Sequence, residues 1–393
     1  MSAKLESITF PKLIVVGLLF VFVLTATEGL ASNASTIKIG ALLDLSGPFS
    51  SFGTVAYRSI RLAVENINLQ GGIGGCSLEI MVFDTMSDEN RLIDGATQLK
   101  EQGAVALIGP SAAQNCLLIR KFAEDNRIPL MLVSGTSPVL TFSGIKTSWT
   151  FSSTLNFSSE LKALFGVFQK RGYQNLGVLV QADSFYRELF LWIRGYAPEY
   201  GLGLGCAVGF NPNSTDISRK IDYINRCEPD IALVWANDQT RDMVQNALTS
   251  VEVPVALSHS LYEENIAWGA NSTSSLLLFV AIPRALAPVG LKRSLSFSAK
   301  SFLNSWKGEL ESANFSLKLC AAQAWDGVMI LSKALGAGGS KGRSQLRYAL
   351  ENSIRSYHGV IGKISYDKRD HSLVDPASLQ VLRFFGGHWG FAK

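Results

Sequence analysis

The segment from Ile37 to Ile80, IKIGALLDLSGPFSSFGTVAYRSIRLAVENINLQGGIGGCSLEI, decides the fold. It begins with a short apolar run, Ile37–Leu43, which is typical of a buried parallel strand. A loop over Ser46–Gly53 follows and carries two phenylalanines among Ser, Gly and Pro. From Val55 the apolar residues recur at helical spacing until two glycines end the helix, and a second strand begins. This pattern predicts a βαβ unit, and its first loop lies where α/β sheets bind ligands.

The same alternation of strand and helix continues through most of the chain. Further strands are expected at Leu78–Phe83, Val105–Ile108, Ile128–Val133, Leu176–Val180, Cys206–Phe210, Asp230–Trp235, Val253–Leu257 and Leu276–Ala281. The series divides near residues 153–157, which predicts two lobes with parallel sheets covered on both faces. We expect residues 32–154 to form the first part of lobe 1 and 155–283 the main part of lobe 2. Residues 284–358 would return to lobe 1, and 359–393 would add C-terminal strands mostly to lobe 2.

Composition and the N-terminus indicate an exported protein. The 36 basic and 32 acidic residues show no cluster that would attract nucleic acid. Lys4 and Lys12 precede the apolar run Leu13–Leu24, and small residues follow near Ala31. We interpret 1–31 as a signal peptide that is cleaved, with an uncleaved anchor as the alternative. No later apolar stretch is long enough to cross a membrane, so we expect a soluble secreted or periplasmic protein.

Motifs for catalysis and metal binding are absent from the sequence. The glycine-rich run 71–75 has no lysine at P-loop spacing and does not lie between a strand and the following helix. There is no G-x-S-x-G elbow, and the four histidines are scattered. We therefore expect no enzyme activity, no metal and no cofactor. The cysteine count is five, so at least one is unpaired; Cys206 and Cys227 flank one predicted helix and are either a disulfide or two buried thiols.

An ordered set of segments resembles one family over nearly the whole mature chain. The segments are IGALLDLSGPFSSFG, ENINLQGGIGGCSLEIMVFDT, ALIGPSAAQ, NRIPLMLVSGTSPVLT, RGYQNLGVLV, PDIALVWAND and AQAWDGVMILSKAL. Together they are similar to the extracytoplasmic solute-binding proteins of the branched-chain amino acid and amide type, the leucine/isoleucine/valine-binding protein-like group. The resemblance implies a type I periplasmic-binding fold, in which two Rossmann-like α/β lobes are joined by a hinge of three crossovers. It also implies a ligand in the cleft between the lobes.

Two turns of the first lobe match the family's site for a carboxylate or amide oxygen. Ser111 and the amides from Ala112 lie at a corner that opens a helix, where free N–H groups and the helix dipole favour an anion. Ala113 stands where the family commonly has serine, so its amide remains but the hydroxyl is missing. In the second turn, Thr136 matches the family's hydroxyl ligand.

Four other positions complete the implied site. Ser134 and Gly135 match residues that bind through their backbone, although Ser134–Pro138 would suit a plain turn equally. Phe52 matches an aromatic wall of the side-chain pocket, or packs beneath the loop. Tyr186 matches an aromatic residue from the second lobe, or faces the core of that lobe.

The sequence departs from the family after the strand Val253–Leu257. Members that bind α-amino acids usually place an acidic residue there for the ligand's ammonium group, but this chain has Ser258–Tyr262. A buried ammonium without a charged partner costs several kcal/mol. Glu263, Asp238 or Asp183 would have to reach it, or else the ligand lacks the amine. His259 is then a donor to a polar or anionic ligand, or a histidine of the surface or core.

The resemblance implies a receptor that closes on a small molecule. The expected ligand is an amino acid, an amide, or an aromatic or aliphatic carboxylate, and an ABC-type membrane permease would receive it. We expect the receptor to act as a monomer. The alternative is a sensing protein that acts with a separate signalling receptor.

Overall fold

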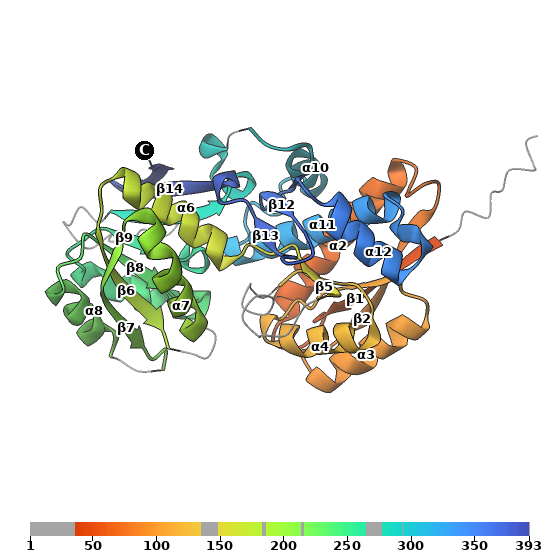
Figure 1. The fold of residues 1–393 in the computed structure, drawn as a ribbon, viewed down its shortest axis with the longest axis horizontal. Helices are drawn as coiled ribbons and strands as arrows, with labels where there is room; N and C mark the ends of the chain where they lie inside the picture. Colours follow the sequence, from red (N-terminus) through yellow and green to blue (C-terminus); the bar gives the residue numbers. More distant parts are fainter. Residues whose placement is uncertain are drawn as a thin grey trace, which may run out of the picture.

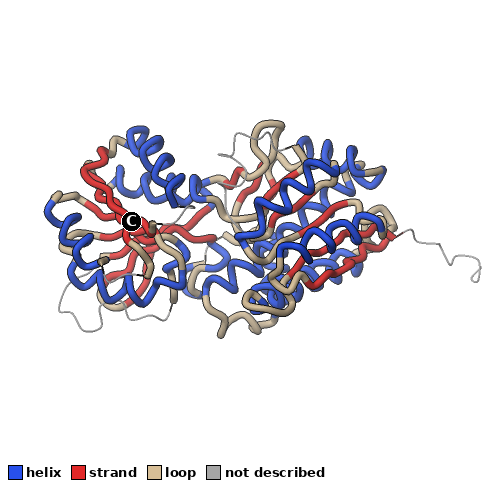
Figure 2. Tube along the Cα trace, turned by 90° about the horizontal axis from the view of Figure 1, so that it is seen from below, coloured by secondary structure: helices blue, strands red, loops and turns tan. Residues whose placement is uncertain are grey.

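The protein folds into two lobes, each built around one β-sheet (Figure 1). This computed structural model describes residues 36–134, 148–182, 186–213, 216–264, 277–292 and 294–392, with the backbone alone for 186–188. The predicted α/β class with parallel-sheet lobes is confirmed. Figure 2 shows helices on both sides of the strands in each lobe.

The first sheet consists of five parallel strands in the spatial order β2-β1-β3-β4-β5. Its strands are β1 (Thr36–Leu43), β2 (Ser77–Asp84), β3 (Ala106–Ile108), β4 (Leu130–Leu132) and β5 (Thr150–Ser152). The helices around it are α2 (Ser50–Leu69), α3 (Glu89–Glu101), α4 (Cys116–Asn126), α11 (Phe315–Gly336) and α12 (Arg343–Ser353). Helices α2, α11 and α12 lie on one side of the strands and α3 and α4 on the other (Figure 1).

Both faces of the first sheet are buried, which explains the continuous apolar run of β1. Ala41 and Leu43 join the core beneath α2 and α11, whereas Leu42 packs with the side chains of α3 and α4. Alternate residues of a strand point to opposite faces, so a strand covered by helices on both faces needs apolar residues throughout.

The loop predicted over Ser46–Gly53 is wrong at its second half, because α2 already begins at Ser50. Phe52 therefore lies in the first turn of a helix. The glycine that suggested a loop serves close packing, since a Cβ atom at Gly53 would lie 2.0 Å from the carbonyl oxygen of Asp44. This contact joins the start of α2 to the end of β1, and a sequence pattern does not reveal it.

The second sheet has seven strands in the order β15-β14-β10-β9-β8-β6-β7. They are β6 (Asn175–Gln181), β7 (Gly203–Phe210), β8 (Ile231–Trp235), β9 (Val255–Leu257), β10 (Leu278–Pro283), β14 (Leu379–Phe385) and β15 (His388–Phe391). Strands β14 and β15 run antiparallel to their neighbours, and the other five are parallel. Its helices are α6 (Phe157–Lys170), α7 (Tyr186–Tyr196), α8 (Ile217–Arg226) and α9 (Arg241–Ala247).

The remaining elements are short or lie between the lobes. Helix α10 (Phe297–Trp306) packs on α2 and α11, and β11 (Tyr357–His358), β12 (Lys363–Ser365) and β13 (Leu373–Val374) form a small antiparallel sheet. The short 3-10 turns are η1 (Ala113–Asn115), η2 (Ala197–Tyr200), η3 (Asp238–Thr240), η4 (Leu248–Ser250), η5 (His259–Leu261), η6 (Arg284–Leu286), η7 (Val289–Leu291), η8 (Gly339–Lys341) and η9 (Pro376–Ser378).

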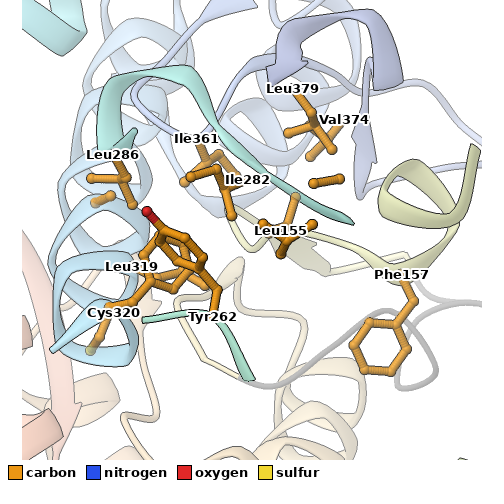
Figure 3. Packing of buried hydrophobic residues seen from close by; sticks show 14 of the residues in the cluster. Leu155, Phe157, Tyr262, Ile282, Leu286, Leu319, Cys320, Ile361, Val374 and Leu379 are labelled. Carbon is orange, nitrogen blue, oxygen red and sulfur yellow. The ribbon is translucent and has the colours of Figure 1, made fainter. Parts of the chain in front are cut away.

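The chain crosses between the two lobes three times: after β5, after β10 and after α12. Apolar side chains of all three connections belong to one hydrophobic cluster, in which Figure 3 labels Leu155, Phe157, Ile282, Leu286, Ile361, Val374 and Leu379. Hydrogen bonds also join the first and third connections. The Tyr366 hydroxyl donates to the carbonyl oxygen of Ser152 at 2.7 Å, and Asn156 Nδ2 donates to that of Ser372 at 2.6 Å.

Helix α11 holds the third connection through a buried acid. The Asp326 carboxyl accepts hydrogen bonds from the amides of Val360 and Ile361 and, at 3.3 Å, from the Tyr357 hydroxyl. Burial raises the pKa of Asp326 to about 7, although these three donors act in the opposite direction. The hinge therefore contains a titratable group within its core.

Candidate functional site

A buried acid, Asp44, organises the ends of the strands in the first lobe. Its backbone N–H donates to Ser111 Oγ at 2.9 Å, and Ser111 Oγ donates in turn to Asp44 Oδ2 at 2.5 Å. The Thr85 hydroxyl donates to the other carboxylate oxygen at 2.8 Å. The ends of β1, β2 and β3 are thereby fixed to one another. The predicted ligand residue Ser111 thus has its hydroxyl held inside the lobe, so what it can offer a ligand is its backbone.

The helix corner after Ser111 contains two exposed residues at the start of η1. Ala112 is buried in extended conformation (φ −94°, ψ 121°) and precedes η1, whose first two residues, Ala113 and Gln114, are exposed. Helix α4 continues from η1 without a break. The first N–H groups of a helix have no acceptor within it, and they add to the positive end of the helix dipole. This corner is therefore a suitable site for a carboxylate or another oxygen acceptor.

The end of β4 lies against this corner. Ser134 Oγ donates to the carbonyl oxygen of Pro110, and the Cys116 thiol donates to the carbonyl oxygen of Ser134 at 3.3 Å. The structure thus brings Ser134 next to the Ser111 corner. Complete burial raises the pKa of Cys116 to about 12, so this thiol is a packing and hydrogen-bonding group. Gly135 and Thr136, also predicted for the site, lie outside the described residues.

The turn between β1 and α2 is fixed by Asp84. Its carboxylate accepts from the amides of Leu45, Ser46 and Met86 and, at 2.7 Å, from the Ser46 hydroxyl. Partial burial raises the pKa of Asp84, but these hydrogen bonds outweigh it and leave the pKa below its ordinary value. These hydrogen bonds thus fix the conformation of the turn between β1 and α2.

Phe52, the predicted wall of the pocket, lies beside helix α11. Its ring is half-buried and packs against the main hydrophobic core, and its carbonyl oxygen accepts from the Cys320 thiol at 3.5 Å. Tyr262, three residues beyond His259, packs edge-on against Phe315 of the same helix with 4.8 Å between ring centroids. Helix α11 therefore contacts both the first turn of α2 and Tyr262 of the second lobe. Figure 3 shows Tyr262 beside Leu319 and Cys320 of this helix.

In the second lobe, His259 is clamped by a fully buried glutamate. Glu160 of α6 accepts the His259 backbone N–H at Oε1 (2.6 Å), and its Oε2 lies 2.7 Å from His259 Nδ1. The other ring nitrogen, Nε2, lies 3.5 Å from Ser260 Oγ. Tyr186 begins α7, but its side chain is outside the described residues.

Glu263 and Asp238 are two further acids close to this turn in the sequence. Glu263 Oε2 accepts the backbone N–H of Phe315 at 3.2 Å and lies 4.0 Å from Arg241 Nη1. Asp238 is half-buried in η3, and Asp183 lies outside the described residues. Glu160 and Glu263 are thus engaged with protein partners, as is Glu264, whose Oε2 lies 4.0 Å from Lys318 Nζ.

A family profile described as "Periplasmic binding protein" matches residues 36–387. The chain belongs to this family. Proteins of the periplasmic binding protein family are extracytoplasmic ligand binders rather than enzymes, and the resemblance to the leucine/isoleucine/valine-binding group is confirmed.

Individual relatives of the family are distant. The leucine-, isoleucine-, valine-, threonine-, and alanine-binding protein of Pseudomonas aeruginosa is 21% identical over 208 residues, or 52% of this chain and 56% of that protein. Glutamate receptor 2.9 of Arabidopsis thaliana is 29% identical over 165 residues, or 42% of this chain and only 17% of the receptor. A leucine complex of an ABC transporter substrate-binding protein from Desulfitobacterium hafniense superposes with a TM-score of 0.70 at 19% identity, covering 91% of this chain and 100% of that one. At this identity the superposition supports the fold alone.

Several polar residues of the candidate site were not predicted from the sequence. They are Asp44, Glu160 and a group in the second lobe, in which Gln181 Oε1 accepts from the Thr240 hydroxyl at 3.0 Å and the Asn237 amide at 3.2 Å. Asp44 directly follows an apolar strand, and this position at the carboxyl end of a parallel strand could have indicated a site residue. Glu160 has no comparable signal, because it lies within an amphipathic helix.

Two further features bear on function within the described part of the chain. No group of three or more His, Cys, Asp or Glu side chains there has the arrangement of a metal site. None of the helices described is both long and apolar enough to span a membrane.

Proposed function

We propose that this chain is an extracytoplasmic receptor, without catalytic activity, whose two lobes close on a small polar ligand and deliver it to an ABC-type permease. Its membership of the periplasmic binding protein family over residues 36–387 carries the proposal. The hinge of three connections, packed in a single cluster, supports closure of one lobe against the other.

In this proposal the first lobe binds a carboxylate or amide oxygen. The amides of Ala112, Ala113 and Gln114 donate at the start of η1, with Ser111 and Ser134 fixing the geometry behind them. Gly135 and Thr136 extend the same site, as the family resemblance implies. Phe52 forms an apolar wall, because its ring lies half-exposed at the start of α2.

The second lobe closes over the other end of the ligand with Tyr186 and His259. We propose a ligand without an α-ammonium group, since Glu160 is occupied by His259, and Glu263 contacts Phe315 and Arg241. A carboxylic acid or an amide with an apolar body fits these contacts. Among the described acids near the His259 turn, this leaves Asp238, half-buried in η3, as the group that an α-ammonium would have to reach.

Closure follows from dividing the ligand's contacts between the lobes. Only the closed state satisfies both ends of the ligand, so binding shifts the open–closed equilibrium by its differential affinity for the two states. The receptor is proposed to act as a monomer and to release the ligand when a permease reopens the cleft.

The proposal is tested by small-angle X-ray scattering with a ligand selected in a thermal-shift screen. A saturating ligand is expected to raise the melting temperature by mass action and to reduce the radius of gyration. A ligand that raises the melting temperature while the radius of gyration stays constant would contradict closure.

A second candidate function is ligand sensing with a separate signalling partner. The 29% identity to a plant glutamate receptor over 165 residues favours this alternative. Reconstituted permease distinguishes the two: ligand-dependent stimulation of its ATPase activity by this chain supports delivery, and no stimulation by the ligand-bound form supports sensing.

A further inference from the structure

Two cysteines lie near each other at the outer edge of the second sheet. Cys206 lies in β7, the edge strand, and is buried to 6% exposure. Cys227 caps the C-terminus of α8 and is half-buried. Figure 1 places β7 and α8 at the end of the second lobe that is remote from the first lobe.

The two cysteines lie on elements that pack against each other, the edge strand β7 and the end of α8. The Cys227 thiol donates to the carbonyl oxygen of Tyr223 at 3.2 Å, and burial together with this neighbouring thiol raises the pKa of the Cys206 thiol. The strand is irregular at this point, because its register with β6 shifts by one residue at Gly205, just before Cys206. A bulge of this kind redirects the following side chain, here onto the end of α8.

This proximity distinguishes the pair from the other cysteines. Cys116 and Cys320 each donate to a backbone carbonyl oxygen instead, on Ser134 and Phe52 respectively. Cys76 is half-buried beside the Gly-rich turn, where its backbone pairs with Ile73. The structure thus holds Cys206 and Cys227 as neighbouring thiols, between elements that already pack together.

We propose that Cys206 and Cys227 form a disulfide bond in the mature, extracytoplasmic protein, which ties the end of α8 to the edge strand β7. Extracytoplasmic compartments are oxidising, and neighbouring thiols there become bonded. The bond would close the segment from residue 206 to residue 227 and protect an edge strand from separating from its sheet.

The chemistry requires a disulfide of another molecule as oxidant. The more accessible thiolate, that of Cys227, attacks one sulfur of this disulfide and releases the other as a thiolate. Cys206 then attacks the Cys227 sulfur of the mixed disulfide and releases the second thiolate. Two protons and two electrons leave the cysteine pair, and the oxidant is reduced to two thiols.

Burial controls when this reaction occurs. Burial and the neighbouring Cys227 thiol raise the pKa of Cys206 to about 12, so this residue stays protonated in the folded, reduced lobe. Oxidation is therefore expected while β7 and α8 are still assembling, or during local opening of this edge.

Thiol titration of the full chain after refolding in a glutathione redox buffer tests the proposal. With five cysteines and two bonded, five minus two leaves three thiols that react with Ellman's reagent in denaturant. Peptide mapping without reduction should recover Cys206 linked to Cys227. Five reactive thiols, or a bond to Cys76, would overturn the proposal.

Reduction of the wild type and of cysteine variants distinguishes the effect of this disulfide on stability from a general effect on folding. Dithiothreitol is expected to lower the melting temperature by about 3–8 °C. Cys206→Ala and Cys227→Ala should each abolish the response to dithiothreitol, whereas Cys76→Ala should retain it. Ligand affinity should be the same with and without dithiothreitol, because the pair lies away from the proposed ligand site. A response that survives both substitutions would refute the assignment.

Discussion

Replacement of Ala113 by proline removes one hydrogen-bond donor from the proposed anion site and leaves the helix intact. Ala113 is exposed and occupies the first position of η1, where proline fits because that N–H has no acceptor within the helix. The preceding residue, Ala112, already has the extended conformation (φ −94°, ψ 121°) that precedes proline. The substitution therefore tests the amide itself.

The expected loss of ligand affinity is large for the removal of one hydrogen bond. A hydrogen bond to a charged group contributes about 1.5–3 kcal/mol, so Ala113→Pro should weaken ligand binding by roughly 10- to 150-fold. The free energy of unfolding should change by less than about 0.5 kcal/mol, as for an exposed position without a lost contact. Ala113→Ser is the matched control, because it keeps the amide and adds the hydroxyl common in the family; its affinity should be unchanged or higher.

Isothermal titration calorimetry with the ligand found by thermal shift measures the affinities, and urea denaturation measures the stability of each variant. An unchanged dissociation constant for Ala113→Pro, with normal stability, would remove the α4 corner from the ligand site. Equal loss of affinity in both variants would show that the position matters through packing and would refute the role of the amide.

Two further predictions concern buried acids outside the helix corner. Glu160→Ala removes both contacts to His259 and should lower the free energy of unfolding by about 3 kcal/mol in urea denaturation. Glu65→Ala, at an exposed pair, should change it by less than about 1 kcal/mol, and equal effects would contradict the clamp. The pKa of Asp326 is about 7 in the folded protein and ordinarily 3.8, so the folded state binds the extra proton between these values and stability must fall as pH rises through that window. The difference in free energy of unfolding between wild type and Asp326→Asn should change by about 4 kcal/mol across this pH window. A difference that does not depend on pH would contradict the assignment.

Local patterns in the sequence predict the elements of this fold well. The run Ile37–Leu43 and the helix after it follow from periodicity, and the strand–helix alternation gives the two sheets. The sequence pattern places the start of α2 too late, because Gly53 packs on Asp44 and this contact is tertiary. The antiparallel pairing of β14 and β15 also depends on which strand they meet.

The candidate site depends on residues that are far apart in the chain. Asp44 and Ser111 are 67 positions apart, and Glu160 and His259 are 99 apart. Periodicity marks Ser111 only as a corner and His259 only as a histidine after a strand. Their hydrogen-bond partners come from the folded arrangement, and these partners determine that Ser111 offers a ligand its backbone rather than its hydroxyl.

We propose that the chain binds a small molecule through its carboxylate or amide oxygen and that this molecule lacks an α-ammonium group. A thermal-shift comparison of matched pairs tests this most directly: L-leucine against 4-methylpentanoate and its amide, and L-phenylalanine against 3-phenylpropanoate. We expect the member of each pair without the amine to raise the melting temperature, and its amino acid counterpart to raise it less. Tighter binding of L-leucine or L-phenylalanine than of the corresponding acid and amide would contradict it.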